Sequence, residues 1–167
     1  MTTGMQTVLH TVMIGVGATL AMDLWAFFGK RVLGIAPLDY ALVGRWIGHF
    51  GRGEFRHEAI ARAPKVAGEA AIGWAAHYAI GIAFAAGLVA IWGEHWLRNP
   101  SFGPAMAVGL ATTMAPFFVL QPCLGLGVAA SRTPAPNKAR VRTVVTHLSF
   151  GAGLYLTAVI TSHLIGS

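Results

Sequence analysis

Four long apolar runs occupy most of this chain, and they constrain its fold more than any other feature. The runs cover roughly residues 7–28, 70–92, 104–130 and 143–164. Each reaches the ~20 residues that an α-helix needs to cross a ~30 Å hydrocarbon core. Charged residues make up only 11% of the chain, whereas soluble domains carry about 25%. The sequence therefore predicts an all-α, polytopic membrane bundle of four transmembrane helices, with residues 1–167 forming a single membrane domain.

The lysines and arginines alternate with these apolar runs. Seven of the twelve lie between the first and second runs, four lie between the third and fourth, and Arg98 alone lies between the second and third. Short cytoplasmic loops of membrane proteins are enriched in basic residues. The pattern therefore predicts cytoplasmic loops at residues 29–69 and 131–142. It also predicts that both termini are periplasmic, in a multi-pass protein of the inner membrane.

The net charge of +6 bears on the partners of the chain. The positive charge lies beside the predicted spans, where topology already explains it, and it includes no long Lys/Arg run. We therefore expect no nucleic-acid partner. The expected partner is the lipid bilayer, and above all its anionic lipids at the cytoplasmic face, which attract a basic residue by ~1 kcal/mol near the surface.

Apolar residues recur at three- and four-residue steps within the first basic loop. This spacing is followed by Leu38, Leu42, Val43, Trp46, Ile47 and Phe50. Asp39 and Arg45 fall on other faces, Pro37 is placed to open a helix, and Gly51 is placed to close it. The pattern predicts an amphipathic helix over residues 37–50 that lies on the cytoplasmic membrane interface. The alternative is a short helix that caps the bundle.

Polar residues that could carry chemistry lie at a similar depth in all four runs. Ionisable groups inside a membrane are costly, on the order of 2.5–3.5 kcal/mol, and are therefore functional candidates. The predicted intramembrane polar layer comprises Asp23, His77, His147, Gln121 and Cys123. Counted at 1.5 Å per residue from the basic ends of their runs, Asp23, His77 and His147 lie ~7–12 Å deep.

Several chemistries are open to this layer. Asp23, His77 and His147 can together bind a divalent metal ion, because two imidazoles and a carboxylate resemble catalytic zinc and non-haem iron sites. The same groups can relay protons, or form a buried polar clamp that sets helix register. Two histidines on separate helices can also ligate haem. No metal-binding or catalytic spacing motif accompanies them, so the sequence assigns neither a cofactor nor an enzymatic reaction.

The function that follows is an integral membrane protein that is proton-coupled or handles metal ions through the Asp/His layer. A non-catalytic structural or accessory membrane subunit is the alternative, and a haem-bearing redox protein is a third reading. We also expect a homo-oligomer, because four thin helices with glycine-rich faces leave little room for a closed pathway within one protomer.

The remaining histidines receive simpler interpretations. His10, His95 and His163 lie at the opposite ends of the runs and are expected at the membrane interface. His49 and His57 lie in the first basic loop. There we expect His57, beside Glu58, to belong to a solvated face.

Several segments resemble a family of small bacterial inner-membrane proteins, known as domain of unknown function 2938. The segments that carry the resemblance are residues 31–35, 38–46, 73–81, 115–122 and 130–134. The resemblance covers nearly the whole chain and implies a bacterial four-span protein. It implies no activity, cofactor or catalytic residue.

Overall fold

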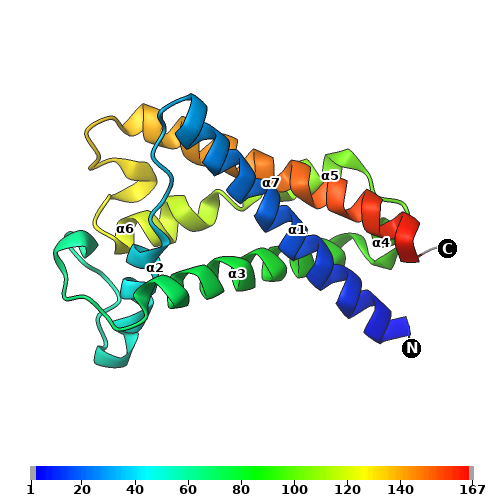
Figure 1. The fold of residues 1–167 in the computed structure, drawn as a ribbon, viewed down its shortest axis with the longest axis horizontal. Coiled ribbons are helices and arrows are strands. Elements are labelled where there is room, and N and C mark those ends of the chain that lie inside the picture. The colour runs from blue at the N-terminus through cyan, green and yellow to red at the C-terminus, as the bar shows by residue number, and fades with distance from the viewer. Residues whose placement is uncertain (1–2, 166–167) are drawn as a thin grey trace. The chain divides into compact units, whose positions relative to one another are not determined.

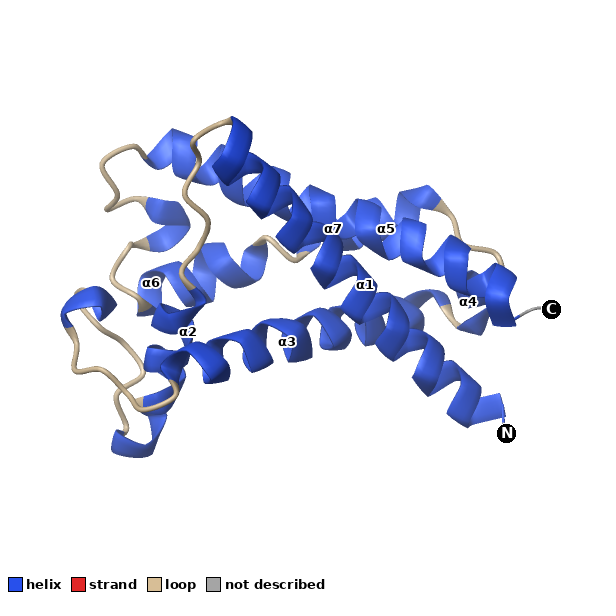
Figure 2. Ribbon diagram, in the orientation of Figure 1, coloured by secondary structure: helices blue, strands red, loops and turns tan. Residues whose placement is uncertain are grey.

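The computed structural model describes residues 3–165, which form helices joined by loops and contain no β-strand (Figures 1 and 2). The elements, in chain order, are α1 (Thr3–Val32), α2 (Tyr40–Gly48), η1 (Phe50–Arg52), η2 (Ile60–Arg62), α3 (Glu69–Trp92), α4 (Glu94–Arg98), α5 (Phe102–Ala111), η3 (Pro116–Leu120), α6 (Gln121–Cys123), η4 (Val128–Ala130) and α7 (Pro136–Ile165).

Four helical segments within the described residues are long and apolar enough to cross a membrane. They cover Gly4–Val32, Glu69–Trp92, Phe102–Cys123 and Pro136–His163. The predicted all-helical class is therefore confirmed, as is the presence of four helical segments that are long and apolar enough to span a membrane. The segments differ from the predicted runs by more than four residues at two ends. The third stops at Cys123 rather than at residue 130, and the fourth begins at Pro136 rather than at residue 143.

Prolines and glycines explain both differences. Gly125 and Gly127 adopt positive φ angles of 91° and 75° after Pro122, and this left-handed backbone ends the third helix. Pro136 lacks a backbone N–H, which the first position of a helix does not need, so the fourth helix can start at this residue. Both boundaries depend on local backbone geometry. Counting apolar residues does not detect this geometry, so the predicted runs missed both boundaries.

The third span is not a continuous α-helix. α5 ends at Ala111, residues 112–113 form a turn, and η3 is a π-helix that starts at Pro116. A proline inside a helix removes the bond to the carbonyl four residues earlier, here that of Thr112, and its ring crowds that carbonyl. The helix is therefore interrupted one turn before Pro116, inside the segment that is apolar enough to span a membrane.

The predicted helix over residues 37–50 is present but shorter. α2 begins at Tyr40, because the Asp39 side chain caps it by accepting a hydrogen bond from the Ala41 N–H at 3.0 Å. Pro37 therefore precedes the helix instead of opening it. α2 ends at Gly48, with His49 as its C-cap. Its position at the membrane interface stays a prediction.

The chain divides into two compact units. The first unit comprises Met1–Pro37, Tyr78–Thr112 and Thr146–Ser167, and the second comprises Leu38–His77 and Thr113–Val145. The core of the first unit is built from apolar side chains of α1, α3, α4, α5 and α7, among them Ile14, Leu88, Trp96, Phe150 and Leu154. In this unit the start of α1 and the end of α7 both lie on the right of Figure 1.

The second unit contains α2, short helical turns, loops, and the first turns of α3 and α7. A Cβ on Gly44 of α2 would meet the Glu69 carbonyl of α3, and a Cβ on Gly73 would meet the Tyr40 carbonyl. The two helices can therefore approach this closely only because both positions are glycine. The loop before α3 also pairs with the end of the third span, through His57 N–H to the Cys123 carbonyl at 2.8 Å.

Candidate functional site

Asp23, on α1, contacts a phenol of α3 within the first unit. The Tyr78 hydroxyl donates a hydrogen bond to Asp23 Oδ2 at 2.9 Å, and both side chains are half-buried. The two residues lie in segments that are apolar enough to span a membrane. Asp23 is therefore a carboxylate with a defined hydrogen-bond donor from a neighbouring helix, and Tyr78 is a member of the site that the sequence did not single out.

His147, on α7, contacts the interruption of the third span, also within the first unit. Its Nδ1 lies 2.8 Å from Thr112 Oγ1, and this hydroxyl also lies 2.7 Å from the Gly109 carbonyl oxygen. A hydroxyl carries one hydrogen, so it can donate to the carbonyl or to the imidazole but not to both. When Thr112 donates to Gly109, His147 Nδ1 must carry the proton that it donates to Thr112.

The other three residues of the predicted layer belong to the second unit. The His77 ring stacks on that of Tyr40, with centroids 4.1 Å apart. Gln121 donates to Thr143 Oγ1 at 3.3 Å, and its Oε1 is buried with no hydrogen-bond partner in the described part of the chain. Cys123 is half-buried. The gathering of all five side chains into one layer stays a prediction.

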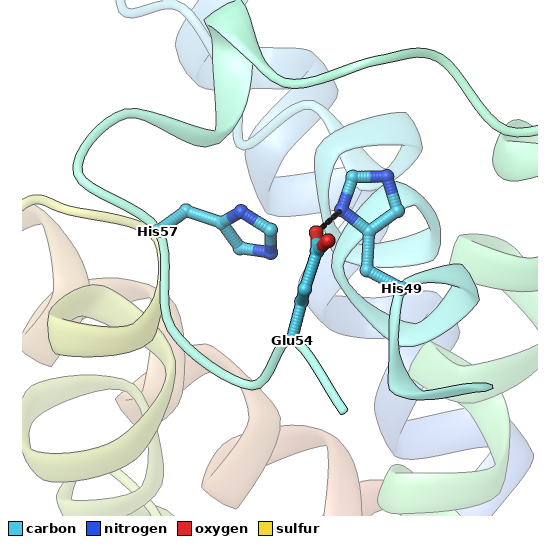
Figure 3. A group of neighbouring side chains, drawn as sticks. All are labelled: His49, Glu54 and His57. Atoms are coloured by element: carbon cyan, nitrogen blue, oxygen red, sulfur yellow. Dashed lines mark ion pairs between the residues drawn. The ribbon is translucent and has the colours of Figure 1, made fainter. Parts of the chain in front are cut away.

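A second group of candidate ligands lies in the loop after α2. His49, Glu54 and His57 offer nitrogen and oxygen atoms that all lie within 4.8 Å of one another. Figure 3 shows the Glu54 carboxylate between the two imidazole rings. The ring centroids of His49 and His57 are 4.9 Å apart. The predicted metal ligands Asp23, His77 and His147 are not members of this group.

Burial distinguishes this group from an ordinary loop surface. The His49 side chain is fully buried, with 0% exposure, whereas that of Glu54 is 51% exposed. His57 is half-buried, and its Nε2 is a buried atom that finds no hydrogen-bond partner within residues 3–165. The expectation that His57 belongs to a solvated face is therefore wrong. Its backbone bond to Cys123 draws it against the third span, and sequence periodicity could not reveal that contact.

An ion pair holds the loop that surrounds these histidines. Arg45 Nε and Nη2 donate to the two carboxylate oxygens of Glu69, each at 2.8 Å, and Arg45 Nη1 lies 3.2–3.3 Å from the carbonyls of Ile60, Ala61 and Ala63. These hydrogen bonds to Glu69 are the main reason why the pKa of Arg45 is raised above its ordinary value. Arg45 is only 6% exposed. Its side chain is therefore buried against the loop and α3 and does not lie on a solvent-exposed face of α2.

One signal in the sequence could have found the histidine group. Two histidines and a glutamate occur within residues 49–57, and the positive φ of Gly53 turns the chain between them. The position of His57 in a basic loop, however, favours the interpretation that this residue faces solvent. The buried ion pair carried no such signal, because its partners are 24 residues apart.

The comparisons with known proteins give a family and no activity. Neither a curated protein nor a solved structure matches the chain significantly. The model of the family described as "Protein of unknown function (DUF2938)" matches residues 12–161, and the chain therefore belongs to this family.

Proposed function

We propose that this integral membrane protein moves protons, or couples to their movement, through the polar side chains of its first unit. The observation that carries the proposal is the contact between the interrupted third span and His147. Discontinuous helices near the middle of a membrane are typical of secondary transporters, where they expose backbone and side-chain polar groups to an ion or substrate.

The Thr112 hydroxyl supports the proposal because its single hydrogen has two acceptors. It lies within hydrogen-bonding distance of both His147 Nδ1 and the Gly109 carbonyl oxygen. Rotation of this hydroxyl changes which nitrogen of His147 can hold a proton. Imidazole titrates near neutral pH, so such a coupled pair is suited to receiving a proton and passing it on.

The Asp23–Tyr78 contact supports the same reading. A carboxylate inside a membrane-spanning segment is costly, and proteins retain such groups mainly along ion pathways and proton relays. A phenol at 2.9 Å can donate to the ionised carboxylate and so stabilise it. A purely structural role would require only the hydrogen bond, which Asn at position 23 could also accept.

Proton flux into liposomes tests the proposal. The purified protein is reconstituted around a pH-sensitive dye, and a potassium gradient with valinomycin sets an inside-negative potential. Removal of a positioned proton-transfer group costs about 10²-fold or more in enzymes. We therefore expect wild-type protein to admit protons, and Asp23→Asn and His147→Gln each to lose most of this flux.

Asp39→Asn is the matched control, because it makes the same substitution outside the spans and Asn also caps helices. It should keep the wild-type flux. Wild-type liposomes no leakier than protein-free liposomes would contradict the proposal, as would full flux in Asp23→Asn. Either result would favour the structural or accessory role.

A further inference from the structure

We infer that His49, Glu54 and His57 form a binding site for a zinc-like divalent cation in the second unit. The inference is independent of the proton pathway proposed for the first unit. It rests on three features: the hydrogen-bonding state of His49, the spacing of the donor atoms, and the buried nitrogen of His57.

The state of His49 is set by a backbone carbonyl. His49 Nε2 lies 3.0 Å from the Pro64 oxygen, which can only accept, so Nε2 must carry a hydrogen and donate it. In neutral His49 the lone pair is therefore on Nδ1. A histidine that binds a metal with one nitrogen usually donates its other N–H to a carbonyl or carboxylate, and this bond orients the ring.

The lone pair of His49 Nδ1 faces a carboxylate. Nδ1 is 3.3 Å from Glu54 Oε2, yet it makes no hydrogen bond within the described residues. A charged N–H to carboxylate bond would be about 2.7–2.9 Å long. Two ligands on a tetrahedral zinc, each about 2.0–2.1 Å from the ion, are by geometry about 3.3 Å apart. The observed spacing therefore fits a shared cation better than a direct hydrogen bond.

His57 supplies the third donor. Its Nε2 is buried, and no atom of residues 3–165 forms a hydrogen bond with it. A buried polar atom with no partner is costly, and a metal ion would satisfy it. The ligand atoms of the three residues lie up to 4.8 Å apart. Because Glu54 is half exposed, its side chain can move so that its carboxylate and both histidines reach one ion.

Neighbouring contacts hold the donors in place. Gly53 has a φ of +73°, which turns the chain so that the Glu54 N–H reaches the His49 carbonyl at 3.3 Å. Arg45 binds three carbonyls of the segment that leads to Pro64, the acceptor for His49. Ligands oriented by such surrounding contacts are typical of built metal sites.

The donor set selects the class of ion. Two imidazoles and one carboxylate suit zinc and similar first-row metals, whereas Mg²⁺ and Ca²⁺ prefer oxygen ligands alone. Three protein ligands leave a fourth tetrahedral position for water or an exchangeable ligand. We therefore assign an open zinc-type site.

Zinc titration of the full chain tests the inference. Tag-free protein in detergent is titrated with Zn²⁺ against a chromophoric chelator, and the melting temperature is recorded with and without zinc. We expect one Zn²⁺ per protomer and a zinc-dependent rise in Tm, since an ion that binds only the folded state stabilises it. Glu54→Gln and His57→Gln should each weaken zinc binding by more than about 10-fold, the lower bound for loss of even a supporting partner.

Glu58→Gln and His95→Gln are the matched controls, because they make the same substitutions at exposed positions outside the group. Both should bind zinc as tightly as the wild-type protein does. The inference fails if wild-type protein does not bind zinc stoichiometrically. It also fails if Glu54→Gln, whose half-exposed position makes a folding defect easy to avoid, retains wild-type affinity.

Discussion

At the scale of single residues, the guanidinium of Arg45 contacts α3 and the loop before it, and each of its three nitrogens has an acceptor. The fork of Nε and Nη2 matches the two oxygens of Glu69. Glu69 Oε2 also accepts the Val66 N–H at 3.1 Å, so the pair ties the loop to the start of α3. Arg45 is therefore one of the contacts that fix the loop between α2 and α3.

Arg45→Lys tests this role. A lysine keeps the charge, but its single ammonium group cannot present a planar fork to Glu69 while also binding three carbonyls. We expect a lower Tm in detergent, measured by the loss of helical circular dichroism. Arg52→Lys, at an exposed position in the same loop, should leave Tm unchanged. Equal Tm values for the two variants would show that charge alone, and not the fork, holds the loop.

At the scale of elements, the contact between α2 and α3 depends on two glycines. Gly44 and Gly73 bring each helix against a backbone carbonyl of the other, and a backbone atom cannot move aside as a flexible side chain can. The apolar spacing of residues 38–50 predicted that a helix exists here. It did not predict that the glycine of α2 would be the contact surface.

Gly73→Ala should therefore destabilise the protein. The added methyl group would overlap the Tyr40 carbonyl, and overpacking of this kind typically costs about 1–3 kcal/mol. Gly87→Ala is the control on the same helix. Apart from the surrounding turns of its own helix, no atom of the described residues lies within 4 Å of the added Cβ. Gly87→Ala should therefore be neutral or stabilising by up to about 1 kcal/mol through helix propensity. Denaturant unfolding in mixed micelles measures both, and equal unfolding free energies would refute the close contact.

At the scale of the whole molecule, the alternation of apolar segments and basic loops predicts one orientation. In this predicted orientation all four segments cross the membrane, which places both ends of the chain on the same side, opposite the loops at residues 29–69 and 131–142. Periplasmic termini, residence in a bacterial inner membrane, contact with anionic lipids and self-association all stay predictions.

Cysteine labelling tests the orientation. Cys123 is the only cysteine, so a Cys123→Ser background allows single cysteines to be placed at exposed positions. A membrane-impermeant maleimide applied to intact cells should label Gly4→Cys and His163→Cys but not Gly51→Cys, because the basic loop stays in the cytoplasm. Lysed cells should label all three. The opposite pattern in intact cells would invert the topology.

The sequence by itself determined the helical class, the four apolar segments and the existence of a helix near residues 37–50. These properties depend on the composition and spacing of neighbouring residues, because each transmembrane helix satisfies its own backbone hydrogen bonds. The polar candidates Asp23, His77 and His147 were also found this way, because a charged or titratable group stands out in an apolar run. The residues that contact them in the fold could not be found from the sequence.

Only the tertiary structure decided which polar atoms meet. Thr112 and His147 are 35 residues apart, and Tyr78 and Asp23 are 55 residues apart. Composition carries no information about such pairings. Burial of His49 likewise depends on the Pro64 carbonyl and on the Arg45 contacts that position the loop. In a sequence, a solvated loop histidine cannot be told from one that can bind a metal ion. Packing distinguishes the two, because burial removes water and leaves the lone pair of the imidazole without a hydrogen-bond donor.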